Sequence, residues 1–179
     1  MVAATPVSLE EYLSTSYDPD CEYAEGRVLD RHVGEFNHSF LQVAICVALR
    51  EFGLRAYTEL RCQVKPARFR VPDVLALARG EKRERRYMTS TPYIVVEILS
   101  PPDAVSGLRD TVGGLREKID DYIELGIPNI WTVDPDAQTF TIHRHREAHS
   151  FTDRITTSDG AIALDPIDIF RRMTEDEAQ

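Results

Sequence analysis

Cysteine, long apolar runs and positive charge are all scarce in this sequence. The three cysteines, Cys21, Cys46 and Cys62, are odd in number and are not spaced like zinc ligands, which argues against a disulfide framework and against a zinc finger. No apolar run approaches the roughly 20 residues that span a membrane. The first residues also lack the cationic start and apolar core of a secretory signal. We therefore expect a cytoplasmic protein with no membrane partner.

The shortage of positive charge gives a formal net charge of -9 at pH 7. This balance argues against a protein that coats nucleic acid non-specifically, because neutralising phosphates requires Lys and Arg. The charges are distributed unevenly, since residues 61–86 hold nine Lys or Arg and only three acids. The sequence leaves two interpretations of this segment open, a surface that meets a polyanion and an ordinary solvated loop.

No internal repeat, linker or low-complexity tract divides the 179 residues. A chain of this length suits one domain with a hydrophobic core of its own. We expect a single domain over residues 1–179, with a core at about residues 8–171 and a frayed C-terminal tail at residues 173–179.

Apolar spacing and turn residues predict the main elements. Helices are expected over residues 35–52 and 115–125, and a hairpin is expected to turn near Glu25 and Gly26. Strands are expected within residues 55–65, 70–78, 93–99, 129–134, 139–146 and 150–156. This mixture predicts an α+β fold in which helices flank a mixed central β-sheet.

The helix expected over residues 35–52 has two apolar stripes. The first stripe consists of Phe36, Phe40, Val43 and Val47, and the second consists of Leu41, Ile45, Ala48 and Phe52. A helix that is apolar on two sides is typical of a well-buried position. We therefore expect this helix to lie against the sheet and to be covered on both sides.

Two carboxylates interrupt strands that are otherwise apolar. Asp73 stands in RVPDVLALA on the face shared by Leu75 and Leu77, and Glu97 interrupts YIVVEIL. If the two strands pair, the acids come within a few ångströms of each other, which is repulsive without a cation. Each acid could be neutralised by an Arg or by backbone donors. Alternatively, the pair binds Mg²⁺ or Mn²⁺, which take one or two carboxylates and keep several waters.

The helix expected over residues 115–125 adds a cation to this pair. Lys118 lies on or beside the inward stripe of the helix, and Tyr122 follows one turn later. The ammonium group could therefore reach both acids. The alternative is an ordinary exposed lysine beside Glu117 and Asp121.

In order along the chain, the motifs VPDVLAL, YIVVEILSP and EKIDDYIELGIPNIWTVDP resemble the Uma2 group of endonucleases, within the PD-(D/E)XK nuclease superfamily. The resemblance covers roughly residues 9–168. It implies a restriction-endonuclease-like core in which Asp73 and Glu97 bind a divalent metal and a lysine assists. The usual lysine position of the superfamily holds Leu99 here, and Lys118 matches the position that Uma2-like sequences use instead.

The resemblance adds three candidate site residues. An acidic residue near the first hairpin and a histidine that opens the first long helix match Glu25 and His38, where they could complete a metal shell or orient a water. Glu25 is equally interpreted as a turn residue, and His38 as a cap or a partly buried ring. Tyr122 completes the K-x-x-x-Y part of the motif.

The expected function is that of an Mg²⁺- or Mn²⁺-dependent endonuclease that hydrolyses phosphodiester bonds of nucleic acid, most directly DNA. Asp73 and Glu97 would hold the ion, and Lys118 would orient the attacking water or stabilise negative charge. One alternative is a catalytically silent nuclease fold that binds or regulates, as the acidic balance and Leu99 suggest. Another is a metal-assisted hydrolase of a small phosphate ester. A homodimer is also expected, because cutting two strands needs two sites.

Overall fold

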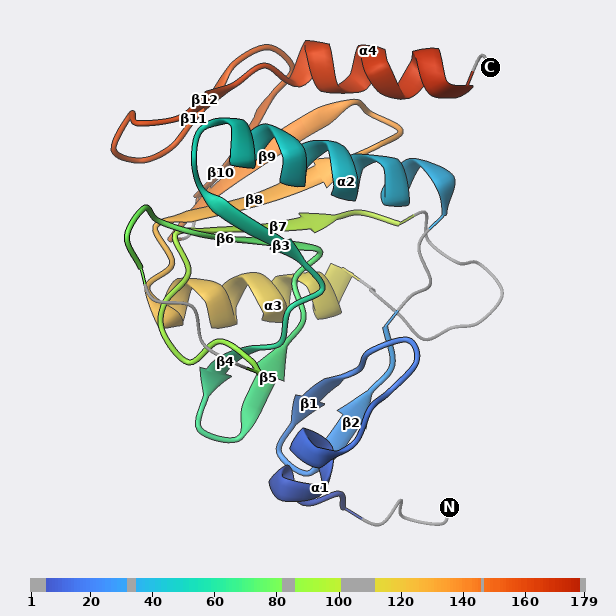
Figure 1. Cartoon of the computed structure of the whole chain (residues 1–179), viewed down its shortest axis with the longest axis vertical. Helices are drawn as coiled ribbons and strands as arrows, with labels where there is room; N and C mark the ends of the chain where they lie inside the picture. Colours follow the sequence, from blue (N-terminus) through green and yellow to red (C-terminus); the bar gives the residue numbers. More distant parts are fainter. Residues whose placement is uncertain (1–5, 32–34, 82–85, 101–111, 146, 178–179) are drawn as a thin grey trace.

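The computed structural model describes residues 6–31, 35–81, 86–100, 112–145 and 147–177. Four helices and twelve strands lie in this described part (Figure 1). In chain order they are α1 (Leu9–Ser14), β1 (Glu22–Ala24), β2 (Arg27–Leu29), α2 (Phe36–Glu51), β3 (Arg55–Thr58), β4 (Cys62–Lys65), β5 (Arg68–Arg70), β6 (Val74–Leu77), β7 (Ile94–Ile98), α3 (Val112–Leu125), β8 (Asn129–Asp134), β9 (Thr139–Arg144), β10 (Glu147–Phe151), β11 (Ile155–Thr156), β12 (Ala163–Leu164) and α4 (Pro166–Glu177).

The central sheet has six strands in the order β10-β9-β8-β7-β6-β3. Strands β7 and β8 run parallel, whereas the other neighbouring pairs are antiparallel, so the sheet is mixed. Helices α2 and α4 cover one face of the sheet and α3 covers the other (Figure 1). The expected α+β fold with a mixed central sheet is therefore confirmed. A four-stranded sheet, β2-β1-β5-β4, lies beside this core, at the end of the molecule where α1 lies (Figure 1).

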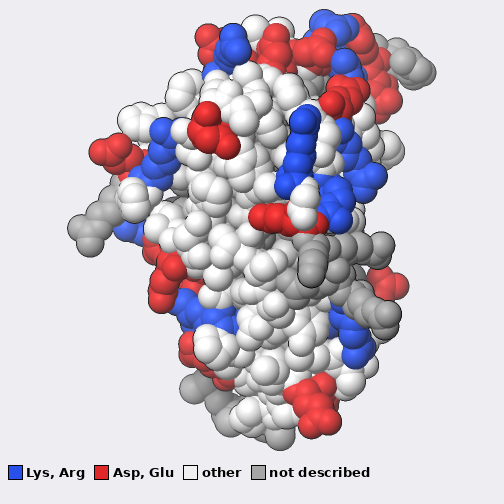
Figure 2. All heavy atoms as spheres, turned by 60° about the vertical axis from the view of Figure 1, so that its left-hand side comes forward, with Lys and Arg blue, Asp and Glu red and all other residues white. Residues whose placement is uncertain are grey.

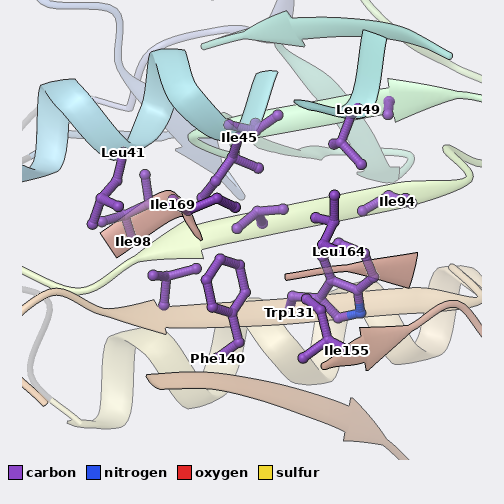
Figure 3. Close-up of a cluster of buried hydrophobic side chains, with 14 of the residues drawn as sticks. Leu41, Ile45, Leu49, Ile94, Ile98, Trp131, Phe140, Ile155, Leu164 and Ile169 are labelled. Atoms are coloured by element: carbon purple, nitrogen blue, oxygen red, sulfur yellow. The ribbon is translucent and has the colours of Figure 1, made fainter. Parts of the chain in front are cut away.

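Strand β7 lies between the two halves of the hydrophobic core. Ile94, Val96 and Ile98 belong to the cluster under α2 and α4, whereas Val95 belongs to the cluster under α3. Figure 3 shows the first cluster, in which side chains from α2, the sheet and α4 meet. Because successive strand residues face opposite sides, Glu97 projects toward α3 with Val95. β-Branched residues dominate this run, which suits a strand buried on both faces.

Helix α2 departs from its expected burial. Leu41, Ile45 and Leu49 are fully buried against the sheet, as Figure 3 shows. The stripe that was expected to be covered as well is largely exposed, with Phe36 at 90% and Val43 at 61% relative exposure. The prediction of burial on both sides is therefore wrong, because α4 packs along one flank of α2 and leaves the side opposite the sheet open.

Two boundaries also differ from those expected. Residues 173–177 belong to α4 rather than to a frayed tail, because Met173 continues the buried stripe of Ile169 and Phe170. The strand expected over residues 70–78 is broken, since β5 ends at Arg70 and β6 begins at Val74. No helix within the described residues combines the length and the apolar composition needed to cross a membrane.

Candidate active site

Asp73 lies in the break between β5 and β6, at the point where the chain passes from the small sheet to the central one. Strands β6 and β7 pair with Val74 opposite Val96. Extending this register by one residue brings Asp73 opposite Glu97. Both acids have only 4% relative exposure, so two buried carboxylates face the same region.

Three groups donate to the carboxylate of Asp73. Arg31 Nη2 lies 2.9 Å from Oδ1. The backbone nitrogen of Ile98 lies 2.7 Å from Oδ2, and His38 Nε2 lies 3.3 Å from the same oxygen. Burial favours the neutral acid, but His38, Arg31 and the Ile98 donor outweigh burial and hold the pKa of Asp73 below its usual value. Burial lowers the pKa of His38, and Asp73 more than compensates, so the pKa of His38 is raised.

Glu97 has weaker cationic support than Asp73. Tyr122 donates its hydroxyl to Oε1 at 2.5 Å, and Lys118 Nζ lies 3.4 Å from Oε2. Burial raises the pKa of Glu97; Lys118 opposes this effect, whereas Asp73 and Glu22 add to it, and the resulting pKa is about 7. Burial and the nearby carboxylates also raise the pKa of Tyr122, so this phenol stays protonated and acts as a donor.

Glu22 is a third buried carboxylate of the site, and the sequence analysis missed it. It comes from β1, and its Oε1 lies 3.2 Å from Lys118 Nζ and accepts the backbone N–H of Val71 at 3.1 Å. Burial alone would raise the pKa of Glu22, but Lys118 and Arg70 outweigh burial and lower it. The sequence could have indicated Glu22, because it is an acidic residue among the apolar residues Cys21, Tyr23 and Ala24 of a predicted strand. The same pattern identified Glu97.

Arg70 connects this site to the body of α3. Its Nη1 lies 2.9 Å from Glu22 Oε2, and its Nη2 lies 2.7 Å from Asp121 Oδ2. Arg68 and Lys65 also reach Asp121, at 3.1 and 3.0 Å. Lys65, Arg68 and Arg70 belong to the basic segment that was considered as a polyanion-binding surface. In the structure each of them makes ion pairs with acidic residues of the same chain. On the face shown in Figure 2, acidic and basic side chains lie beside one another.

The structure brings five of the six predicted site residues together. They are Asp73, Glu97, Lys118, Tyr122 and His38, joined by the contacts described above. Glu25 lies elsewhere. It occupies the turn between β1 and β2 with a φ of 51°, its side chain is 72% exposed, and it pairs with Arg68 at 2.6 Å. This placement agrees with its interpretation as a turn residue.

A hollow of about 160 Å³ opens beside the Asp73 end of the site. His38 and Leu99 form part of its wall, together with residues at the start of α2 and at the end of β8. Binding sites for whole small molecules usually exceed about 300 Å³. This space therefore suits an ion with its waters, or one phosphate group, better than a nucleoside.

The residues present fit a hard divalent ion and do not fit zinc. Within the described part of the chain, no group of three or more His, Cys, Asp or Glu side chains could hold one ion. A closed zinc cage would need four such ligands, whereas Mg²⁺ binds through one or two carboxylates and retains waters. Asp73 and Glu97 supply oxygen donors of that kind. Burial is the main cause of the raised pKa of Glu97, and a bound cation would add to the opposing effect of Lys118.

Comparisons with known proteins agree with this geometry. A family model with the description "Uma2: Putative restriction endonuclease" matches residues 9–167. A similar solved structure is "a putative nuclease belonging to DUF820 from Anabaena variabilis ATCC 29413", with a TM-score of 0.77 and 24% identity. The match covers 94% of this chain and 99% of that chain. No curated protein matches the chain.

Proposed function

Since the chain belongs to the Uma2 family and has a nuclease fold, we propose that this site hydrolyses phosphodiester bonds of DNA with the help of Mg²⁺ or Mn²⁺. The observation that carries the proposal is the pairing of two buried carboxylates, Asp73 and Glu97, with the Lys118 ammonium 3.4 Å from Glu97. Asp73 and Glu97 would hold the ion. When bound, such an ion supplies positive charge against the phosphate and lowers the pKa of a water.

The protein's own groups prepare the site for this reaction. Tyr122 donates to one oxygen of Glu97, and Ile98 donates its backbone N–H to one oxygen of Asp73, so both carboxylates are held in position. The ammonium group of Lys118 lies between the carboxylates of Glu22 and Glu97. An ammonium in that position would orient the attacking water and stabilise negative charge that develops on the phosphate.

A DNA-nicking assay tests this function directly. Supercoiled plasmid is incubated with the protein in Mg²⁺, in Mn²⁺ or in chelator, alongside D73N and E97Q, which remove charge while nearly preserving shape. Asp153→Asn makes the same chemical change at an exposed position and is the matched control. We expect metal-dependent nicking by the wild type and D153N and its loss in D73N and E97Q. Equal nicking by all four proteins would contradict the proposed site.

One observation favours a second candidate, a silent nuclease fold that binds without cutting. Arg31 and His38 already neutralise Asp73, so this carboxylate is stabilised without a metal. Arg31 also reaches Glu59 at 3.2 Å and is itself almost buried. This candidate predicts that divalent ions neither bind nor change the stability of the protein, a difference that calorimetry can measure without any nucleic acid substrate.

A further inference from the structure

The outer side of α2 carries most of the large hydrophobic side chains that are exposed in the described part of the chain. They are Phe36 at 90%, Val43 at 61% and Val47 at 46% on α2, with Ile167 at 58% on α4 as the fourth. The three on α2 lie, by helical spacing, on the side opposite Leu41, Ile45 and Leu49, the row that packs on the sheet. A row of exposed apolar side chains on one helix is typical of an interaction surface.

The exposed positions of α2 are symmetric about Val43. The exposed residues of α2 and its N-cap are Glu35, Phe36, Ser39, Val43, Val47, Arg50 and Glu51. Phe36 and Arg50 each lie seven residues from Val43, and Ser39 and Val47 each lie four residues from it. Residues with these spacings share one face of an α-helix. When two such faces pack antiparallel, each exposed position meets its symmetric counterpart on the other copy, as a two-fold interface requires.

We propose that two copies of this chain form a homodimer by packing their α2 helices antiparallel, with the two-fold axis at Val43. Val43 then contacts the Val43 of the other copy. Val47 packs beside the Ser39 of the other copy, where a small side chain leaves room for it. Phe36 lies over the Arg50 of the other copy. This proposal is independent of nuclease activity, since none of these residues contacts the Asp73 and Glu97 pair.

Charges at the two ends of α2 act on this arrangement. Arg50 stands in the last turn of the helix and Glu35 precedes its first turn. In an antiparallel pair the last turn of one helix lies beside the first turn of the other, so Arg50 meets Phe36 of the other copy and lies beside its Glu35. A cation over an aromatic ring and an ion pair both favour this Arg50 contact, whereas Glu51 faces the same Glu35 and that like-charge contact opposes it. The antiparallel helix dipoles add a further small attraction.

Arg50 is already held near the end of its own helix. Its Nε and Nη2 donate to the carbonyl of Ala56 at 3.0 and 2.7 Å. The guanidinium also lies over the ring of Tyr57, with 5.9 Å between Cζ and the ring centroid, so it has a defined position beside β3 and less side-chain entropy is lost when it binds.

The size of the surface predicts a weak dimer. Helix α2 has 16 residues, which corresponds to a length of about 24 Å. Standard protein interfaces bury about 800 Å² on each partner. One exposed face of a helix of this length supplies less than that, so dimerisation should depend on concentration over an accessible range.

Sedimentation velocity and light scattering over a concentration series test the proposal. We expect the wild type to change from monomer to dimer with rising concentration. Val43→Glu and Val43→Lys each place like charges on the axis and should weaken the dimer at least about tenfold. An equimolar mixture of the two variants places opposite charges on the axis and should restore a mixed dimer.

Ile167→Glu provides the matched control, since Ile167 is exposed to nearly the same degree as Val43 and lies on a different helix. This variant should dimerise like the wild type, and circular dichroism checks that all variants fold. A wild type that stays monomeric up to its solubility limit overturns the proposal, whether or not another protein binds the stripe. Failure of the mixture to dimerise, or equal disruption by I167E, overturns the two-fold axis at Val43.

Discussion

At the residue scale, the site is a balance between buried acids and a few cations. Glu22, Asp73 and Glu97 are all nearly buried, and Lys118 contacts the first and the last of them. Buried charges are costly unless they are paired, so the unequal pairing of these acids decides their protonation. Asp73 is held ionised, whereas Glu97 titrates near neutral pH.

Removal of the Lys118 charge should abolish most of the proposed activity. We expect K118M to lower the rate of plasmid nicking by about 10²- to 10³-fold, the usual effect of losing one group that stabilises charge in the transition state. Lys65→Met removes a half-exposed lysine outside the carboxylate pair, and Arg68 and Arg70 still hold its partner Asp121, so this variant should nick at nearly the wild-type rate. Full activity in K118M would assign the role to another cation.

The metal-free protein should lose stability as pH rises from 5 to 8. The pKa of Glu97 is about 7 in the folded state and about 4.5 when unfolded, so the folded state binds more protons between these values. This contribution, of the order of 3 kcal/mol, is present below pH 4.5 and is lost as pH passes 7. The raised pKa of His38 acts in the same direction as pH rises above 6.5, the ordinary pKa of histidine. The lowered pKa of Asp73 contributes stability that is present above pH 3.8 and is lost only as pH falls below that value.

Thermal melts in chelator at several pH values measure this dependence. The variant E97Q cannot titrate at this position and should show a flatter curve between pH 4.5 and 7. H38N should flatten the curve only above about pH 6.5. A wild-type curve that rises steadily over this range would show that Glu97 is ionised in the folded protein.

At the element scale, the position of α3 depends on one buried aspartate. Asp121 has 2% relative exposure and accepts Arg70, Arg68 and Lys65 from the small sheet. Lys118 lies about one turn before Asp121 on the same helix, so this anchor also positions its ammonium. Arg70 connects α3 to the carboxylate site, because it contacts both Asp121 on α3 and Glu22 on β1.

Asp121→Ala should therefore be strongly destabilising. It leaves the buried Arg70 with only Glu22 and the more distant Glu117 as partners, and breaking a buried ion pair costs about 3–5 kcal/mol. The neighbouring Asp120 is exposed, and D120A should change the free energy of unfolding by no more than about 0.5 kcal/mol. Urea unfolding of both variants gives the comparison. Equal stability would mean that solvent replaces the lost carboxylate around Arg70.

At the scale of the whole molecule, a bound ion should stabilise the fold. An ion present at a hundred times its dissociation constant stabilises the native state by about 2.7 kcal/mol. For a chain of this size, that corresponds to a rise in melting temperature of roughly 5–10 °C. We expect Mn²⁺ to raise the melting temperature of the wild type and D153N, and to have no effect on D73N or E97Q.

The same measurement separates the two candidate functions. Melting that is identical in Mn²⁺ and in chelator, together with increased stability of D73N or E97Q, would favour the silent binding module. Stabilisation by Mn²⁺ without nicking would leave the ion site in place and call for substrates other than plasmid DNA. The α2 dimer is tested separately, by mass in solution, and none of these outcomes affects it.

The sequence by itself determined the fold class, the family and the two carboxylates, because each depends on local patterns. Alternation along a strand marks Glu97 as misplaced in an apolar run, and helical spacing relates Lys118 to Tyr122. The order of the motifs then connects these positions to one family of nucleases, which the family match confirms.

Only the tertiary structure decided which groups meet the carboxylates and which surface stays open. Arg31 reaches Asp73 across 42 positions of sequence, and Arg70 reaches Glu22 across 48, so no local pattern relates these partners. The two stripes of α2 are equally apolar in the sequence, and the placement of the sheet and α4 leaves Phe36 and Val43 exposed. Long-range packing made that choice, because a helix can bury only the sides that other elements reach.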